Sequence, residues 1–506
     1  MSFMIANTKY GLLEGLPAGN QAISVFKGIP YAKPPVGELR WRLPQPPEPW
    51  DGTRKCYTYG KIAVQEWMPE GSFYRKEFWP TPLEMSEDCL YLNVWTPAET
   101  PDERLPVSVW IHGGGLKQGF GHKLEIDGEA FAKKGIVFVS INYRLNMMGF
   151  LAHPELSAEA EREIGHKTSG NYGIFDQIAA LKWVQENITA FGGDPEKVTI
   201  FGQSGGGRSV CTHACSPLSK GLFRGAIMQS GGGLGGALTD DKWDLEDAEA
   251  VGIKLFERMG IKSIEDARKI PAVDIMNAAD AMFKESGRPG AYTPNNDGYL
   301  LAKSYRETML GGLINDAAYM IGSNADDMRH PFKYDYEQIK ADAAKKFGKH
   351  ADKYLEIVHA DDPEKYEEAA RDFGPENMFA QDLGWVRLLD RLGRRPGYLY
   401  MFEQVPPGDD GMGAFHAAEH MYLHMTFTRS WRKYTGEDFE FAKRINAYWT
   451  NFIKYGDPNG DGLAKWEPYT EANPKMMHLQ GECRESDVPQ SERLWMITDA
   501  ALGILD

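Results

Sequence analysis

The sequence predicts an α/β fold, with a central, mostly parallel twisted sheet flanked by helices on both faces. Short runs of apolar and β-branched residues alternate along the chain with longer segments of helical periodicity. In the clearest helical segment, Ile174, Ile178 and Leu181 recur at three- and four-residue steps and so share one apolar face. Strands that alternate with helices pair in parallel, and the helical crossovers then cover both faces of the sheet.

The expected strands are short, apolar and separated by turn residues. They comprise residues 90–95, 107–111, 136–143, 197–201, 318–322 and 398–402. The clearest helix stops at the Gly192-Gly193 pair before Pro195, and a second amphipathic helix is expected at 441–455. Residues from about 240 to 395 carry mostly charged helical patterns. We expect them to form cap-like helical insertions within one domain that spans residues 1–506.

Composition limits the functions that are open to this chain. Its net charge of −16 over 506 residues disfavours nucleic acid and anionic membrane surfaces as partners. No run of about 18 apolar residues occurs, so no membrane-spanning helix is expected. The five cysteines do not suggest a disulfide framework, and the N-terminus lacks a signal-peptide pattern. We therefore expect a cytoplasmic protein, a monomer or small homo-oligomer, unless a leader has been removed.

A nucleophile motif follows the expected strand at 197–201. The run Gly202-Gln203-Ser204-Gly205-Gly206 fits the pattern G-x-S-x-G, in which a serine stands on a sharp turn between a strand and a helix. The flanking glycines let the strand and the helix pass closely enough to make that turn. Glycine is common here, at 54 residues, so the pentapeptide alone is a weak signal. The strand directly before it makes Ser204 the predicted nucleophile.

A second glycine motif, His112-Gly113-Gly114-Gly115, directly follows the expected strand at 107–111. Ester hydrolysis passes through a tetrahedral intermediate whose oxygen is negatively charged. Backbone N–H groups stabilise that oxygen best where no side chain blocks their approach. A plain flexible turn would look similar, but its place upstream of the serine turn favours an oxyanion hole. The N–H of Gly205 is expected to be a further donor.

The serine needs a histidine base and a carboxylate, which should follow it in the order acid, then histidine. Among the 12 histidines, His416 stands out because it lies in a loop of small residues after an expected strand. His420 and His424 are the alternatives. Asp326 and Asp327 follow another expected strand, where a carboxylate can orient an imidazole. The residues alone leave the choice between these two aspartates open.

Short stretches spread over the whole chain carry a family resemblance. They are residues 26–32, 34–37, 87–95, 142–144, 170–173, 191–195, 229–231 and 456–459. In these stretches the chain resembles the type-B carboxylesterases, which include para-nitrobenzyl esterases and cholinesterases. The resemblance implies an α/β-hydrolase fold whose insertions cap an active-site gorge, a small-molecule ester substrate, and no cofactor or metal. Lipase, thioesterase or amidase activity on the same fold is the alternative, and a non-catalytic binding protein is a more distant one.

The resemblance also implies roles for single residues. Ser204 takes the nucleophile position, His416 the general base and Asp327 the acid, where the family usually has glutamate. The oxyanion donors fall on Gly114, Gly115 and Gly205. Gln203 replaces a common glutamate beside the serine, which should lessen any preference for cationic substrates. Gly205 replaces a usual alanine, which should leave the oxyanion donor more mobile.

Two further expectations concern the walls of the gorge. Cys89 stands at a family disulfide position, but the usual partner position is Ala63, so the loop 63–89 should be untethered. It forms either a mobile aromatic wall over the gorge or a hydrophobic cover on the core, through Trp67, Phe73, Tyr74, Phe78 and Trp79.

Lys117, Arg329 and His330 follow the oxyanion glycines and the acid. We interpret them as substrate-binding residues that favour a polar or anionic acid portion of the ester, although solvated loop positions would look the same.

Overall fold

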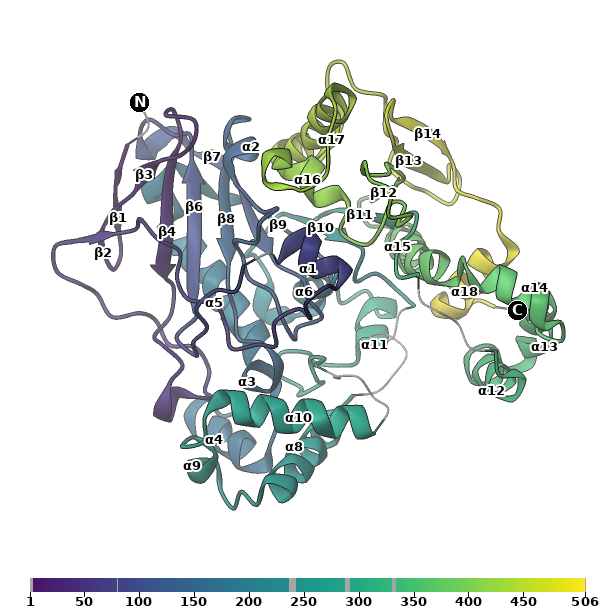
Figure 1. Ribbon diagram of the computed structural model, residues 1–506, viewed down its shortest axis with the longest axis horizontal. Coiled ribbons are helices and arrows are strands. Elements are labelled where there is room, and N and C mark those ends of the chain that lie inside the picture. Colours follow the sequence, from purple (N-terminus) through teal and green to yellow (C-terminus); the bar gives the residue numbers. More distant parts are fainter. Residues whose placement is uncertain (1–2, 80, 236–242, 287–291, 330–333, 506) are drawn as a thin grey trace.

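A large sheet built from strands of both halves of the chain organises the molecule (Figure 1). The computed structural model describes residues 3–79, 81–235, 243–286, 292–329 and 334–505. Within these residues the sheet is 11-stranded, in the order β14-β13-β12-β11-β10-β9-β7-β8-β6-β4-β3. Neighbouring strands from β8 through β7 to β13 pair in parallel, and antiparallel pairs occur only toward the two edges. The predicted mostly parallel sheet is confirmed.

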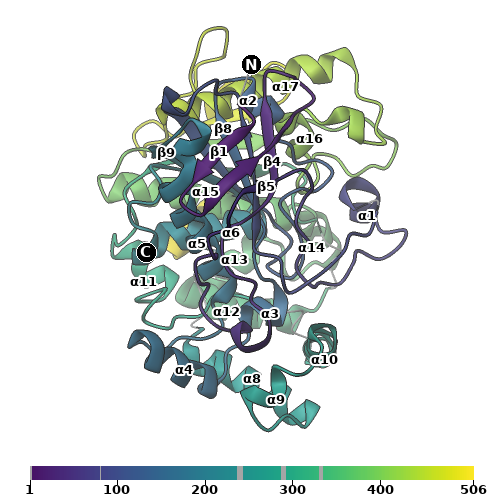
Figure 2. The same cartoon turned by 90° about the vertical axis from the view of Figure 1, so that its left-hand side faces the viewer.

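The strands lie close to their predicted positions. Those of the large sheet are β3 (Leu16–Pro17), β4 (Ser24–Pro30), β6 (Tyr91–Thr96), β7 (Leu105–Ile111), β8 (Val137–Ile141), β9 (Gly193–Gln203), β10 (Gly225–Gln229), β11 (Ala318–Asn324), β12 (Tyr398–Phe402), β13 (Lys475–Leu479) and β14 (Arg484–Asp487). A small sheet of β1 (Ile5–Thr8), β2 (Gly11–Glu14) and β5 (Thr53–Lys55) lies at one end of the molecule, toward the viewer in Figure 2. Strand β9 starts earlier than expected, because the chain pairs with β7 directly after the left-handed turn at Gly192.

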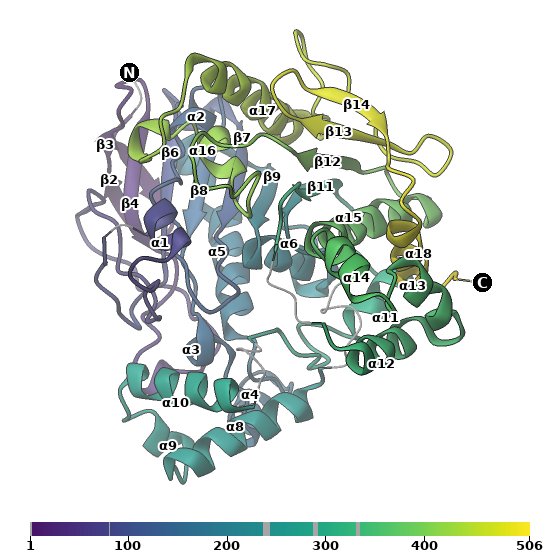
Figure 3. The ribbon, with the colours of Figure 1, turned by 45° about the vertical axis from the view of Figure 1, so that its right-hand side comes forward.

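Helices cover the sheet on both faces, and the side chains of the strands sort accordingly. In β9, Val198 and Ile200 enter one apolar core, whereas Phe201 enters the other. The first face carries α5 (Tyr172–Asn187), α6 (Gly205–Cys215) and α15 (Phe373–Arg391), and the second carries α2 (Glu129–Ala132) and α17 (Gly436–Tyr455) (Figure 3). Helix α17 begins earlier than residue 441 because Thr435 and Asp438 form a capping box.

The other helices lie mainly around the ends of the sheet (Figure 1). They are α1 (Phe73–Phe78), α3 (Asn146–Phe150), α4 (Pro154–Ile164), α8 (Leu245–Met259), α9 (Ile264–Ala267), α10 (Ala272–Glu285), α11 (Tyr305–Leu310), α12 (Tyr336–Phe347), α13 (Ala351–Ile357), α14 (Pro363–Ala370), α16 (Glu419–His424) and α18 (Glu492–Leu502). Helices predominate between residues 240 and 395 as predicted, but β11 and α15 in this range belong to the central layers. Among the described residues, no helix combines the length and apolar character needed to cross a membrane.

A buried ion pair fixes the loop after β8 against α5. The Arg144 guanidinium donates to both carboxylate oxygens of Asp176, at 2.7 and 2.8 Å, and the Arg144 backbone N–H donates to the same carboxylate at 3.0 Å. The two side chains are 3% and 0% exposed. Next to this pair, the Tyr143 hydroxyl donates to the carbonyl of His112 at 2.7 Å. The pair therefore supports the segment that holds the end of β7 in place.

Replacing Asp176 with alanine should leave the Arg144 charge buried without its partner. We expect Asp176→Ala to lower the free energy of unfolding by about 3–5 kcal/mol. Urea denaturation measures this change. The matched control is Glu285→Ala, which removes an exposed carboxylate from its ion pair with Arg258 and should leave the free energy of unfolding nearly unchanged, because solvent screens exposed ion pairs. Equal losses in the two variants would contradict a stabilising role specific to the buried pair.

Candidate active site

Ser204 lies on the turn between β9 and α6, as the motif predicts. Its backbone has φ 59° and ψ −122°, a strained conformation for a residue with a side chain. The turn is possible because the chain segments touch at glycines. A Cβ built on Gly206 would lie 2.0 Å from the carbonyl oxygen of Ile111 at the end of β7, and one on Gly202 would lie 2.5 Å from the same atom. Only glycine fits at these two positions of the motif.

The glycine run after β7 borders this turn. Gly114 and Gly115 have φ values of 119° and 64°, which side-chain-bearing residues rarely adopt. A Cβ on Gly205 would lie 2.8 Å from the backbone nitrogen of Gly115, so the loop directly faces the N-terminus of α6. The first N–H groups of a helix lack partners within the helix and carry its positive dipole end. The three predicted oxyanion residues therefore surround Ser204.

His416 and Asp327 are brought together by two loops that follow neighbouring strands. Asp327 lies after β11 and is fully buried, and His416 lies after β12. Nδ1 of His416 is 2.5 Å from Oδ1 of Asp327. The second oxygen of Asp327 accepts from the backbone N–H of Asn324 at 3.2 Å. Burial lowers the pKa of His416, but the adjacent Asp327 carboxylate outweighs burial and holds that pKa above its usual 6.5.

The neighbouring aspartate points elsewhere. Oδ2 of Asp326 accepts from the Ala414 backbone N–H at 2.6 Å, and Oδ1 pairs with the Arg329 guanidinium at 2.8 Å. The alternative histidines do not contact Asp327 either. Nδ1 of His420 lies 3.5 Å from Oε1 of Glu125, and Nδ1 of His424 is 2.9 Å from the carbonyl of Asp127. Of these two aspartates and three histidines, Asp327 and His416 are therefore the pair that is in contact.

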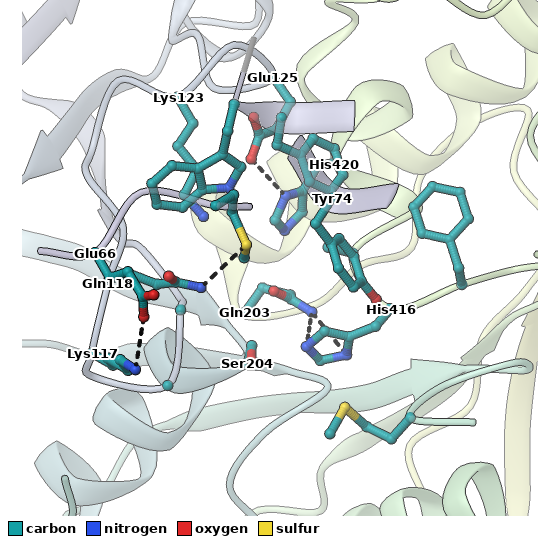
Figure 4. Close-up of a pocket in the computed structure, with 18 of the residues that line it drawn as sticks. Glu66, Tyr74, Lys117, Gln118, Lys123, Glu125, Gln203, Ser204, His416 and His420 are labelled. Atoms are coloured by element: carbon teal, nitrogen blue, oxygen red, sulfur yellow. Dashed lines mark hydrogen bonds and ion pairs between the residues drawn. The ribbon is translucent and has the colours of Figure 1, made fainter. Parts of the chain in front are cut away.

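Gln203 lies beside the other ring nitrogen of His416. Its side-chain amide nitrogen is 3.2 Å from Nε2, and a dashed line marks this contact in Figure 4. Because Nδ1 faces a carboxylate, Nδ1 carries the proton of the neutral ring and Nε2 accepts a hydrogen bond from the Gln203 amide. Within the described part of the chain, no hydrogen bond joins Ser204 Oγ to the ring. The two side chains nevertheless line one cavity of about 1120 Å³.

Aromatic side chains from the loop 63–89 form part of the cavity wall. Tyr74, Phe78 and Trp79 line the cavity, whereas Phe73 packs edge-on against Phe415 and Trp67 against Trp79. The loop was predicted to form either an aromatic wall over the gorge or a hydrophobic cover on the core. Phe78 and Trp79 do both, because they are buried in the core and also line the cavity. The Cys89 thiol at the end of the loop is free, as the missing partner position predicts.

Two of the predicted substrate-binding residues line the same cavity, but both face carboxylates. Nζ of Lys117 lies 3.2 Å from Glu66 and 3.3 Å from Asp280 of α10. Arg329 pairs with Asp326 at 2.8 Å and is half exposed. His330, the third of these residues, lies outside the described residues. The structure adds Lys123 and Glu125, which were not predicted from the sequence, to the cavity wall. His420, which was predicted only as an alternative base, lines the same wall.

Comparison with known proteins identifies the family of this chain. The model of the carboxylesterase family matches residues 3–495. The chain belongs to the carboxylesterase family. A para-nitrobenzyl esterase from Bacillus subtilis is 32% identical in an alignment of 513 positions, which covers 97% of this chain and 98% of that protein. A fumonisin B1 esterase from Sphingopyxis macrogoltabida is 33% identical over 478 residues, covering 92% of this chain and 84% of that esterase.

Solved structures lead to the same family. A thermophilic PNB esterase superposes with a TM-score of 0.82 at 29% identity and covers 98% of this chain and 99% of that chain. The predicted α/β-hydrolase fold and the predicted carboxylic-ester hydrolase are thereby confirmed. In the described ranges, no group of three or more histidine, cysteine or acidic side chains could hold a metal ion.

The contact between Asp327 and His416 predicts a pH dependence. A base must be neutral to act, and its pKa lies above 6.5, so kcat/KM for an ester should rise as pH increases through that raised pKa. Asp327→Asn removes the anionic partner and should shift this rising limb to lower pH. In a serine protease with a Ser-His-Asp triad, replacing the aspartate with asparagine lowers kcat by about 10⁴. We expect a loss of similar order here.

Asp326→Asn is the matched control for this measurement. It removes the neighbouring carboxylate and should leave the position of the rising limb unchanged, with a loss of activity below about tenfold. A larger loss in Asp326→Asn than in Asp327→Asn would show that the acid has been assigned to the wrong aspartate.

Proposed function

We propose that this carboxylesterase hydrolyses small-molecule carboxylic esters through an acyl-enzyme intermediate formed on Ser204. His416 acts as the general base. Asp327 orients its imidazole and stabilises the positive charge that the ring acquires. The observation that carries the proposal is the 2.5 Å contact between His416 Nδ1 and the fully buried Asp327 carboxylate. His416 lines the same cavity as Ser204. A buried carboxylate on Nδ1 leaves Nε2 free of a proton and therefore able to accept one.

In the first step, Ser204 Oγ attacks the ester carbonyl while His416 Nε2 takes the hydroxyl proton. The ring then carries a positive charge, which the Asp327 carboxylate stabilises. For this step Nε2 must turn from the Gln203 amide to the serine hydroxyl. The tetrahedral intermediate collapses, His416 returns the proton to the leaving alcohol, and an acyl-serine remains. Water repeats the sequence and releases the acid.

The negative oxygen of each intermediate is held by backbone N–H groups of Gly114, Gly115 and Gly205. This proposal is supported by the close approach between Gly205 and Gly115 and by the helix N-terminus that begins at Gly205. Such donors are in place before the reaction starts, so they stabilise the developing charge without reorganisation.

The setting of the reaction is also part of the proposal. We infer one domain over residues 1–506 with helical insertions, among which α10 supplies cavity-lining residues, including Asp280 and Phe283. The free cysteines are compatible with a reducing cytoplasm, and the charge of −16 with a protein that binds no nucleic acid. We propose a monomer or small homo-oligomer, with Lys117 and Arg329 at the substrate entrance.

Loss of the nucleophile tests the assignment. Ser204→Ala should lower kcat for 4-nitrophenyl butyrate by about 10⁴–10⁶, because removal of a triad serine eliminates the covalent route. Release of 4-nitrophenol measures the rate, and circular dichroism checks that the variant is folded. Hydrolysis at the wild-type rate by folded Ser204→Ala would refute the proposal.

The neutral side chain of Gln203 predicts that the enzyme has little preference for cationic substrates. Gln203→Glu adds a carboxylate within about 3.2 Å of the His416 ring and should raise its pKa, so that the rising limb moves to higher pH. The added charge should also increase kcat/KM for a choline ester relative to the isosteric 3,3-dimethylbutyl ester. The two esters have the same shape, so their ratio isolates the effect of charge. An unchanged ratio would contradict an electrostatic role for this position.

A further inference from the structure

The cavity contains a polar wall that the proposed chemistry does not use. We call it the Lys123 wall and define it as Lys123, Glu125 and His420. Lys123 and Glu125 lie in the segment between β7 and α2, and His420 lies on α16. All three side chains line the cavity that Ser204 lines, and they are 9%, 0% and 2% exposed. In Figure 4 they lie on the far side of Gln203 from the serine.

The polar atoms of this wall have few partners in the protein. Oε1 of Glu125 lies 3.5 Å from Nδ1 of His420, within ion-pair distance, and Nε2 of His420 lies 3.9 Å from Glu419. Within the part of the chain that the structure describes, neither carboxylate oxygen of Glu125 and neither ring nitrogen of His420 makes a hydrogen bond. Among the described residues, the Lys123 ammonium has no hydrogen-bond or ion-pair partner and faces the Trp79 ring at 5.2 Å. Buried polar groups without partners are costly unless a ligand satisfies them.

The charge of the wall favours an anionic group. Lys117 and Arg329 line the same cavity, but carboxylates already neutralise them. Burial raises the pKa of Glu125 to about 7 despite the nearby lysine, so a substantial share of this group is uncharged near neutral pH. Burial lowers the pKa of His420 to about 4, so its ring is neutral. Burial also lowers the pKa of Lys123, although the nearby Glu125 opposes this shift. The wall then presents one lysine ammonium together with O–H and N–H donors.

We infer that Lys123, Glu125 and His420 form a subsite that binds a carboxylate carried by the ester substrate, apart from the ester bond itself. The inference rests on the proposed esterase function and specifies its substrate class. One oxygen of the substrate carboxylate pairs with the Lys123 ammonium, and the carboxylate also accepts hydrogen bonds from the protonated Glu125 carboxyl and from a ring N–H of His420. Charge-assisted hydrogen bonds of this kind are stronger than neutral ones, which gives the subsite selectivity.

Two pairs of esters test the inference on the full-length protein. The first pair is mono(4-nitrophenyl) adipate and its methyl ester, which place a carboxylate or its neutral form on the acid side. The second is 4-acetoxyphenylacetate and its methyl ester, which do so on the alcohol side. In at least one pair the wild-type kcat/KM should favour the acid over the methyl ester about tenfold at pH 7, the lower end for a hydrogen bond to a charged group.

Lys123→Met removes the ammonium from a side chain of similar length and should reduce that ratio at least about tenfold. The matched control is Lys284→Met, which removes the same charge from an exposed residue of α10 that also lines the cavity. In this variant the acid-to-methyl-ester ratio of kcat/KM should change less than about twofold, because salt screens attraction at long range. Equal changes in the two variants would overturn the subsite, since only general electrostatics would then be at work.

The neutral esters separate this inference from the proposed function. If the wild type hydrolyses the methyl esters but does not prefer either acid, the esterase function stands and the subsite is refuted. Failure to hydrolyse any of these esters would instead count against the proposed function. If Lys123→Met does not fold, the wild-type ratios decide alone. A third ester, 4-nitrophenyl 6-hydroxyhexanoate, identifies a neutral hydroxyl as the true ligand if it is preferred over the adipate, which would also overturn the inference.

Discussion

The site depends on a steric constraint, the close contact of β7, β9 and α6 around the backbone of Ser204. The serine adopts a strained conformation at φ 59°, and the segments beside it approach so closely that a Cβ on Gly206 would meet the Ile111 carbonyl at 2.0 Å. Strain of this kind persists only where the surrounding structure enforces it. The same contact brings Gly115 against the start of α6, so one packing arrangement positions both the nucleophile and the proposed oxyanion donors.

The parallel sheet explains how residues far apart in sequence meet at this turn. Strands β9, β10, β11 and β12 are neighbours in that order and run in the same direction. The loops after them therefore emerge at one end of the sheet, which is where ligands bind in open α/β folds. Ser204, Asp327 and His416 each come from such a loop. The alignment of these strands thus converts a sequence separation of more than two hundred residues into a shared cavity.

Much of the fold and part of the site could be predicted from the sequence. Strand β12 was predicted with its observed bounds, because an apolar run between turns is a local signal. The turn at Ser204 and the glycine run beside it were predictable for the same reason. Asp326 and Asp327 could not be separated by reasoning from the residues alone. Adjacent side chains in a loop point in different directions, and only the fold shows that one contacts His416 while the other contacts Ala414.

Long-range contacts account for what the sequence did not reveal. Lys117 was predicted as a substrate-binding residue that favours an anionic acid portion, but α10 brings Asp280 to within 3.3 Å of it. Lys123 and Glu125 were not singled out, although two charged residues flanking Leu124 before a buried isoleucine are an unusual local pattern. Their significance depends on how few partners their polar atoms have among the described residues, and no sequence pattern reports that. The charge that faces a substrate is therefore a property of the folded cavity.

The most direct test of this account is to identify the residue that becomes covalently modified. The protein would be treated with a 4-nitrophenyl alkylphosphonate, which mimics the tetrahedral intermediate, and then digested and mapped by mass spectrometry. We predict one phosphonyl group per chain, located on Ser204, with loss of esterase activity in proportion to labelling. A label on another residue, or full labelling with activity retained, would contradict the account.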